Sequence, residues 1–286
     1  MRTDTVIMGG GLSGLTCGIA LAKRGQRVTI VASGQSTLLF NGGSMELLGN
    51  IDGTPVTHPL ETIASLPEGH PYRKIGADCI ASLADEAKQL LLDAGINVEG
   101  DAVANHWRVT PMGVAKPAWL TLSENLRIED LKQLPARRLA LMCIRGFFDE
   151  PNSMLANGLK ELGFEVDKHE FTTDEITKLR RSPSEMRAAS LAKRLSSNNA
   201  LQRIADQVNS LAGDADMVLL PSVFGMSDND SYDILKNMVN KPLRLVATLP
   251  PSVGLAVAVM LYRRMKTGSM ILRSVMLSTP FQPSRV

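Results

Sequence analysis

The stretch Thr5-Val6-Ile7-Met8-Gly9-Gly10-Gly11-Leu12-Ser13-Gly14 decides the fold class of this chain. Its apolar start predicts a buried parallel strand, and the glycines that follow predict a tight turn. A helix is expected from about Leu15 to Arg24, and a second strand from Arg27 to Val31. We therefore expect a strand–turn–helix–strand unit of the α/β class, as in Rossmann-like βαβ domains.

The glycines of this unit follow the spacing Gly9-x-Gly11-x-x-Gly14-x-x-x-Gly18. In a Rossmann-like fold the first allows a tight turn, the second lets a phosphate approach the backbone, and the third lets helix and strand pack closely. The free N–H groups at the start of the helix favour an anion. We expect Gly9, Gly11, Ser13 and Gly14 to hold a nucleotide phosphate, and a glycine-rich turn without a ligand is the alternative.

The end of the second strand lacks an acidic residue. Val31 continues into Ala32-Ser33-Gly34, at the point where NAD-binding folds place the carboxylate that binds the adenosine ribose. Ala32 therefore disfavours a generic NAD-dependent reductase and favours FMN, which needs only its phosphate held. Ser33 or Gln35 can still hydrogen-bond a ribose, so FAD is the second choice.

The rest of the chain predicts a second α/β layer. Apolar residues at helical spacing predict a helix over 80–94 with Gly95 as its C-cap. Further on we expect strands at 139–144, 164–166 and 217–220 and helices at 152–162 and 184–211. We divide the chain into a flavin-binding part (1–125), a middle α/β domain that binds substrate or a partner (126–245) and a return segment (246–286).

The composition narrows the class of protein. With 31 Lys and Arg against 29 Asp and Glu and 44% hydrophobic residues, the chain is that of a globular protein with no field that favours nucleic acid. Cys17, Cys79 and Cys143 form no C-x-x-C pair, so we expect no metal or iron–sulfur site and three reduced core thiols. We expect no signal peptide, and the apolar stretch 249–262 is too short to span a membrane.

Seven segments then make a family resemblance specific: Asp4–Leu12, Gly43-Ser44, His106-x-Arg108-Val109-Thr110-Pro111-x-Gly113, Trp119-Leu120, Glu185-x-Arg187-Ala188, Pro221-x-x-Phe224-Gly225 and Thr248–Val253. In this order and spacing the chain resembles the B subunits of anaerobic glycerol-3-phosphate dehydrogenase. The resemblance implies a flavoprotein subunit, with FMN, that helps to oxidise sn-glycerol 3-phosphate to dihydroxyacetone phosphate.

The resemblance also implies partners. The family's B subunit works with the A subunit, which contains FAD, and with the C subunit, an iron–sulfur protein that passes electrons to menaquinone and then to fumarate or nitrate. The complex lies on the cytoplasmic side of the inner membrane, and its B subunit is attached peripherally through the other two. A non-catalytic scaffold that docks the A and C subunits is the alternative role.

The last residues depart from the family. Residues 268–286 do not follow its pattern, and the family's chains continue further, to a segment that closes the flavin domain. We therefore expect the closing segment to be missing, and the chain alone to bind flavin weakly, to be poorly soluble and to lack activity.

Candidate substrate residues lie in the middle of the chain. His106 and Arg108 are two apart, on one face of an extended segment, and are expected to act as the base and the phosphate clamp. A core or surface histidine is the alternative. The glycine-rich backbone at Gly43 and Ser44 is expected to contact the cofactor ring, unless it is an ordinary turn, and Thr110 joins the cofactor residues through the resemblance. Arg187, in a cation-rich stretch, is expected on a solvated helix face or at a contact with another subunit.

Overall fold

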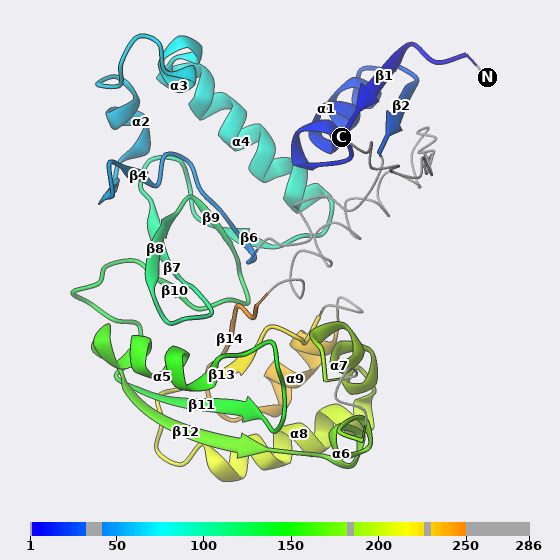
Figure 1. The fold of residues 1–286 in the computed structure, drawn as a ribbon, viewed down its shortest axis with the longest axis vertical. Helices are drawn as coiled ribbons and strands as arrows, with labels where there is room; N and C mark the ends of the chain where they lie inside the picture. The colour runs from blue at the N-terminus through cyan, green and yellow to red at the C-terminus, as the bar shows by residue number, and fades with distance from the viewer. Residues whose placement is uncertain (1, 33–41, 182–185, 226–229, 250–286) are drawn as a thin grey trace, which may run out of the picture.

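A computed structural model describes residues 2–32, 42–181, 186–225 and 230–249. Figure 1 shows three regions: a small unit near the N-terminus, a middle region of short antiparallel sheets, and a layered α/β region at the other end. The α/β class expected from the sequence is confirmed.

The first region is the unit made by β1 (Thr5–Met8), α1 (Leu12–Lys23) and β2 (Val28–Val31). The two strands are parallel, with Thr5 opposite Val28 and Met8 opposite Val31. The predicted strand–turn–helix–strand order is confirmed. The helix starts at Leu12, earlier than expected, because Gly11 already serves as its N-cap.

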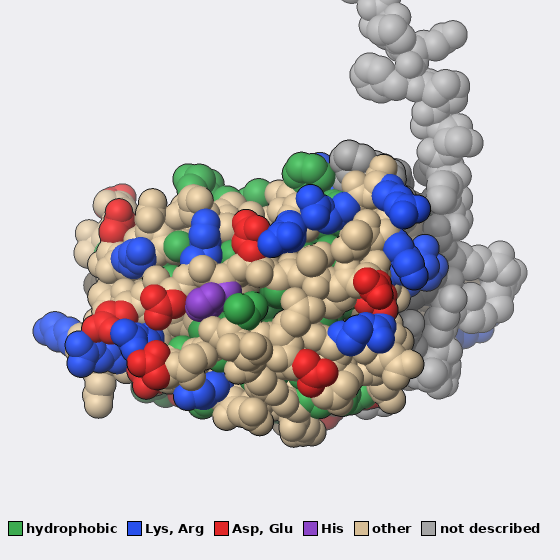
Figure 2. All heavy atoms as spheres, turned by 90° about the horizontal axis from the view of Figure 1, so that it is seen from below, with side chains coloured by type: hydrophobic (Ala, Val, Ile, Leu, Met, Phe, Trp, Pro, Cys, Tyr) green, Lys and Arg blue, Asp and Glu red, His purple; other side chains and the backbone are tan. Residues whose placement is uncertain are grey.

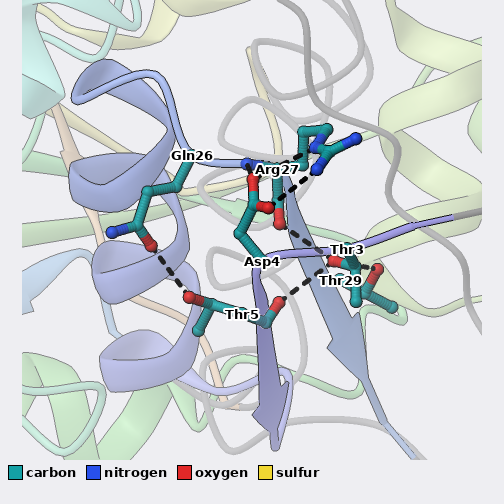
Figure 3. Close-up of polar contacts among 6 residues, drawn as sticks. All are labelled: Thr3, Asp4, Thr5, Gln26, Arg27 and Thr29. Carbon is teal, nitrogen blue, oxygen red and sulfur yellow. Dashed lines mark hydrogen bonds and ion pairs between the residues drawn. The ribbon is translucent and has the colours of Figure 1, made fainter.

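Polar contacts join the outer ends of β1 and β2 (Figure 3). Asp4 accepts hydrogen bonds from the backbone and the guanidinium of Arg27, and their ion pair measures 2.8 Å. The Arg27 guanidinium holds the pKa of Asp4 at about 2. These contacts lie at the end of the strands that is opposite to the glycine turn.

The middle region contains short strands and helices. One sheet has the order β3-β9-β6, a second has the order β10-β7-β8, and β4 and β5 form a hairpin. Their bounds are β3 (Ser44–Met45), β4 (Asn50–Ile51), β5 (Thr54–Pro55), β6 (Val98–Glu99), β7 (His106–Val109), β8 (Ala115–Ala118), β9 (Leu120–Leu122) and β10 (Arg127–Ile128). The helices are α2 (Pro59–Ile63), α3 (Pro71–Ile75) and α4 (Ala77–Asp93).

Helix α4 is the helix predicted over 80–94. It buries Ile80, Ala84 and Leu91, and Gly95 follows it with a φ of +77°, a conformation that favours glycine. Its apolar face packs in one cluster with Leu15, Val28 and Ile30 of the first region. The first region is therefore attached to the middle region through this cluster.

The third region is a parallel sheet with the order β12-β11-β13-β14. Its elements are β11 (Arg138–Ile144), α5 (Asn152–Glu161), β12 (Glu165–Phe171), α6 (Asp174–Leu179), α7 (Ala188–Leu195), α8 (Asn198–Leu211), β13 (Met217–Pro221), α9 (Ser231–Met238) and β14 (Leu243–Val246). Leu139, Leu141 and Cys143 pack with α5, whereas Ala140, Met142 and Ile144 pack with α8 and α9. Helices thus cover both faces of β11.

Two sequence predictions for this region need correction, and so does the prediction about the three cysteines of the chain. The helix expected over 184–211 is two helices, α7 and α8, because the Ser197 hydroxyl accepts from the Ala200 N–H and caps a new helix. Strand β12 runs to Phe171 rather than to Val166, since it pairs with β11 along its whole length. Cys143 is buried, but Cys17 and Cys79 are exposed and are not core thiols.

Figure 2 views the molecule from the lower end of Figure 1, where β12 lies, and shows side chains of both signs of charge interspersed on this face. Arg137 and Arg138 pair with Glu165, and Arg145 pairs with Glu170. Charges of this kind protect an edge strand against pairing with another chain.

The divisions expected after residues 125 and 245 stay predictions. Near them, Leu126 N donates to Leu245 O (2.8 Å), and β10 pairs with β7. Within the ranges that the structure describes, no helix is both long enough and apolar enough to cross a bilayer.

Candidate functional site

The turn between β1 and α1 has the close packing that its glycines predict. Gly9 has a φ of +114°, and its N–H donates to Val31 O (2.8 Å). A Cβ on Gly14 would lie well inside van der Waals contact with the Gly9 carbonyl oxygen. A Cβ on Gly18 would lie 2.8 Å from Ile30 Cδ1. The positive φ of Gly9 and the backbone contact of Gly14 therefore favour glycine at these two positions, whereas a side chain at position 18 would have to displace only the end of the Ile30 side chain.

The start of α1 has the features of an anion site. Gly11 is the N-cap, with extended backbone (φ −81°, ψ −177°), and the first turn contains no acidic side chain. The first N–H groups of a helix have no acceptor within that helix, and they carry a partial positive charge. Leu12, Ser13 and Gly14 occupy this turn, so the residues present fit the phosphate of a flavin nucleotide.

The end of β2 lies close to the glycine turn. A Cβ on Gly10 would be 2.9 Å from the Cβ of Ala32. Position 32 therefore lies beside the turn, and its alanine offers no carboxylate to a ribose. Ser33 and Gln35, the other candidates at this position, lie outside the described residues.

A second group of predicted residues meets around β3, β7 and β9. Ser44 is opposite Thr121 in the β3–β9 pair, and Thr121 Oγ1 lies 2.7 Å from His106 Nε2. Arg108 donates to Glu46 Oε1 (2.9 Å), just beyond β3. Gly43, with a φ of +81°, accepts from Leu122 N through its carbonyl. Gly43 and Ser44 therefore lie beside β9, whose Thr121 hydroxyl contacts His106 of the neighbouring strand β7.

His106 is buried, with 2% of its surface exposed. Burial, and then the positive charge of Arg127, lower the pKa of the imidazole to about 4. The ring is therefore neutral at pH 7. Its Nδ1 has no hydrogen-bond partner within the described part of the chain.

Arg108 and Thr110 have local contacts. The Nη2 of Arg108 serves the ion pair with Glu46, while its Nε is buried with no described partner. Thr110 Oγ1 accepts from Val114 N (3.1 Å) in the β7–β8 turn, whose Gly113 packs against Gly158 of α5. Figure 1 places this hairpin apart from β1 and α1. Thr110 is thus not brought next to the predicted phosphate site.

A cavity of about 450 Å³ lies beside His106. Its wall includes His106 of β7 and Asn105, which directly precedes that strand. Lys88 of α4, Glu99 of β6 and Arg127 of β10 also line it. Of these residues, only His106 was predicted from the sequence as a site residue. The others come from separated segments and form no sequence pattern that could have identified them.

A buried acidic pair at the end of β11 was also not predicted. Asp149 is 1% exposed and accepts from Arg187 and from Ala188 N (3.0 Å), so it caps α7. Glu150 is buried, neither of its carboxyl oxygens has a partner among the described residues, and burial raises its pKa to about 8. Arg187 stands at the N-cap of α7, over the ring of Phe148, rather than on a fully solvated helix face.

Comparison with known proteins gives the family. The FAD binding domain model matches residues 4–275. The B subunit of anaerobic glycerol-3-phosphate dehydrogenase from Yersinia enterocolitica is 39% identical over 259 residues, and that from Pectobacterium atrosepticum is 34% identical over 257. Each alignment covers 88% of this chain and 61% of the relative, so the chain spans less than two thirds of their length.

These relatives confirm the resemblance expected from the sequence. No solved structure matches the chain. The family model names FAD, whereas FMN is the cofactor expected from the sequence, and both are flavins. Because the family model matches nearly the whole chain from the first strand onward, the chain belongs to the family of proteins with an FAD binding domain.

Proposed function

We propose that this chain is a flavoprotein subunit of an anaerobic glycerol-3-phosphate dehydrogenase, in which sn-glycerol 3-phosphate is oxidised to dihydroxyacetone phosphate and a quinone receives the electrons. The observation that carries the proposal is the glycine turn, where Gly14 lies against Gly9 at the open end of α1. The names of the relatives supply the reaction.

The cofactor is held at its phosphate in this proposal. Gly9 provides the turn, Gly11 the open backbone, Ser13 and Gly14 the N–H groups of the first helical turn. A bound flavin supplies the two-electron acceptor. The short side chain of Ala32 favours FMN, which has no adenosine to bind, while the family description favours FAD.

His106 and Arg108 stay our candidates for the substrate, beside Gly43 and Ser44. Each keeps a buried nitrogen without a described partner, His106 Nδ1 and Arg108 Nε, and such nitrogens are suited to a hydroxyl or an anionic oxygen. With a pKa near 4, His106 is neutral at pH 7 and binds a hydroxyl group without carrying charge. Thr110 is the least supported of the predicted residues, since it serves a hairpin turn.

The proposed partners are the FAD-containing A subunit, the iron–sulfur C subunit, and through them the cytoplasmic side of the inner membrane. Fumarate or nitrate is the terminal acceptor in this proposal, and nucleic acid has no role. The relatives are named as B subunits, which supports an assembly of several chains. A scaffold that docks the other subunits without a flavin is the alternative.

Flavin content of the purified chain tests the proposal. Backbone at Gly11 is extended, so Gly11→Val causes no φ strain, but it places a branched side chain at the start of the helix. We expect the variant to melt like the wild type and to lose its flavin. Gly69→Val, at an exposed glycine with open space around it, is the matched control and keeps the flavin.

The same preparation distinguishes the alternatives. Chromatography of the released cofactor identifies FMN or FAD. A folded wild-type chain that holds no flavin, even when it is assembled with the A and C subunits, would favour the scaffold role. A Gly11→Val chain that folds and retains stoichiometric flavin would place the phosphate elsewhere.

A further inference from the structure

We propose that a basic surface at one end of the third region binds a protein partner that presents carboxylates around an apolar pocket. This surface, the Phe148 surface, consists of Phe148, Arg180, Arg181, Arg187 and Arg194, all of them exposed. It is formed by the loop after β11 and by the helices α6 and α7, which pack against each other (Figure 1). That the partner is another subunit of the assembly rests on the proposed function.

Phe148 and Arg187 form the centre of this surface. Phe148 is 56% exposed, and its N–H donates to Met186 O (3.4 Å). The guanidinium carbon of Arg187 lies 5.9 Å from the centre of the Phe148 ring, within the range of a cation–π contact. The same guanidinium pairs with the buried carboxylate of Asp149, which also accepts from Ala188 N. The buried acid therefore fixes the arginine over the ring, while both side chains stay accessible to a partner.

Exposed arginines surround this centre. Arg180, the C-cap of α6, lies against the loop after β11, since a Cβ on Gly146 would be 3.2 Å from Arg180 Nε. Arg181 follows it, and Arg194 lies about two turns beyond Arg187 on the exposed side of α7. Within the described part of the chain, Arg180, Arg181 and Arg194 form no ion pair. The cations around the centre are therefore available to carboxylates of another chain.

The unpaired charge distinguishes this surface from the one beside β12. There, Arg137, Arg138 and Arg145 each pair with a carboxylate of the same chain. The arginines of the Phe148 surface instead repel one another, and carboxylates of a partner would relieve that repulsion. Arg187 uses Nη1 for Asp149, so its other guanidinium nitrogens can contact a partner's carboxylate. Charge complementarity thus predicts an acidic partner.

A protein fits this surface better than a lipid bilayer does. Helix α7 buries its apolar side chains, Ala188, Leu191, Ala192 and Leu195, within the third region. An interfacial helix would need that apolar side to enter the membrane. The apolar group that the surface offers is the Phe148 ring, held beside an arginine. Aromatic and arginine side chains of this kind contribute much of the binding energy in protein interfaces.

Binding of the full chain to the purified A and C subunits, each added separately in biolayer interferometry, tests this inference. Phe148→Ala removes the ring, and the double variant Arg181→Glu with Arg194→Glu reverses two charges that have no described partner. Because these positions are exposed, we expect both chains to melt like the wild type. We expect each to bind the partner subunit about tenfold more weakly than the wild type does.

Two matched controls locate the effect. Val103→Ala truncates an apolar side chain that is 66% exposed in another region. Arg73→Glu with Lys74→Glu makes the same change of charge at exposed positions of α3. We expect wild-type affinity for both. Higher salt is expected to weaken the binding of the wild type more than that of the charge-reversed surface variant, because salt screens exposed charges.

Several results would overturn the inference: no binding of the wild type to either subunit, equal binding by the wild type and folded surface variants, or tighter binding to phosphatidylglycerol vesicles than to both subunits. Flavin content and dye reduction with glycerol 3-phosphate are measured on the same samples. An active, flavin-containing assembly that does not depend on the Phe148 surface refutes this inference alone. A flavin-free wild type that binds through this surface refutes the proposed flavoprotein role alone.

Discussion

Strand β1 of the first region and strand β11 of the third are both apolar and both parallel to their neighbours, yet their surroundings differ. Val6 and Met8 of β1 are 53% and 75% exposed, whereas residues 139–143 of β11 are fully buried and Ile144 is 1% exposed. In β11, helices cover both faces of the sheet. In β1 and β2, α1 and the middle region cover one face.

The difference indicates that the third region mainly stabilises the fold, whereas the first region mainly offers groups that can bind a ligand. Parallel sheets are normally buried on both faces, and burial of apolar surface is the main source of folding free energy. The third region therefore supplies most of the stability. The first region is small and half-covered, and its distinctive feature is a turn that brings backbone N–H groups to one point.

Truncation of a buried side chain in β11 should have the largest effect. Leu141 is fully buried between the sheet and α5, and Leu141→Ala is expected to lower the free energy of unfolding by about 2–5 kcal/mol. Met8→Ala, at an exposed position of β1, is expected to change it by less than about 0.5 kcal/mol. Urea unfolding of both variants measures the difference. Equal losses would show that β1 is covered as fully as β11.

The buried acid that follows β11, Glu150, should make the free energy of unfolding fall as the pH rises. Glu150 has a pKa of about 8 in the folded chain against 4.5 for an exposed glutamate, so the folded state keeps a proton that the unfolded state loses. Stability from this residue is present below pH 4.5 and is lost as the pH rises to about 8.

Glu150→Gln keeps the shape of the protonated acid and does not titrate. We expect wild type and variant to be similar near the lower end of this range, and the variant to be more stable by roughly 2–4 kcal/mol at about pH 9. Urea unfolding at the two pH values tests this. Glu161→Gln, at an exposed position of α5, is the control, and the same gain there would remove burial as the cause.

The ion pair between Asp4 and Arg27 in the first region should make the free energy of unfolding rise with pH, by a smaller amount. Arg27 lowers the pKa of Asp4 from 3.8 to about 2, so the stabilisation is present above about pH 4 and is lost as the pH falls to 2. Both side chains are largely exposed, and exposed pairs contribute little. Asp4→Asn is expected to melt slightly below the wild type at neutral pH and together with it near pH 2. Asp85→Asn, on the exposed side of α4, should follow the wild type throughout.

Local sequence patterns were sufficient for the regular elements. The unit β1–α1–β2, the helices α4 and α5 and the strands β11 and β13 follow from apolar spacing, because burial on one face of a helix or on both faces of a strand leaves a periodic signal. The break between α7 and α8 was missed, since both sides of Ser197 continue the helical spacing and the capping hydrogen bond decides the boundary.

For the candidate site, the glycine turn could be predicted from the sequence, because close backbone approach can be made only by residues without a Cβ and therefore appears as a motif. Only the three-dimensional arrangement of the chain places Ser44 opposite Thr121 and makes His106 buried and neutral. It also decided that Asn105 and Arg127 share a cavity with His106. Burial, charge pairing and cavity shape depend on segments that are distant along the chain, and no local spacing records where those segments meet.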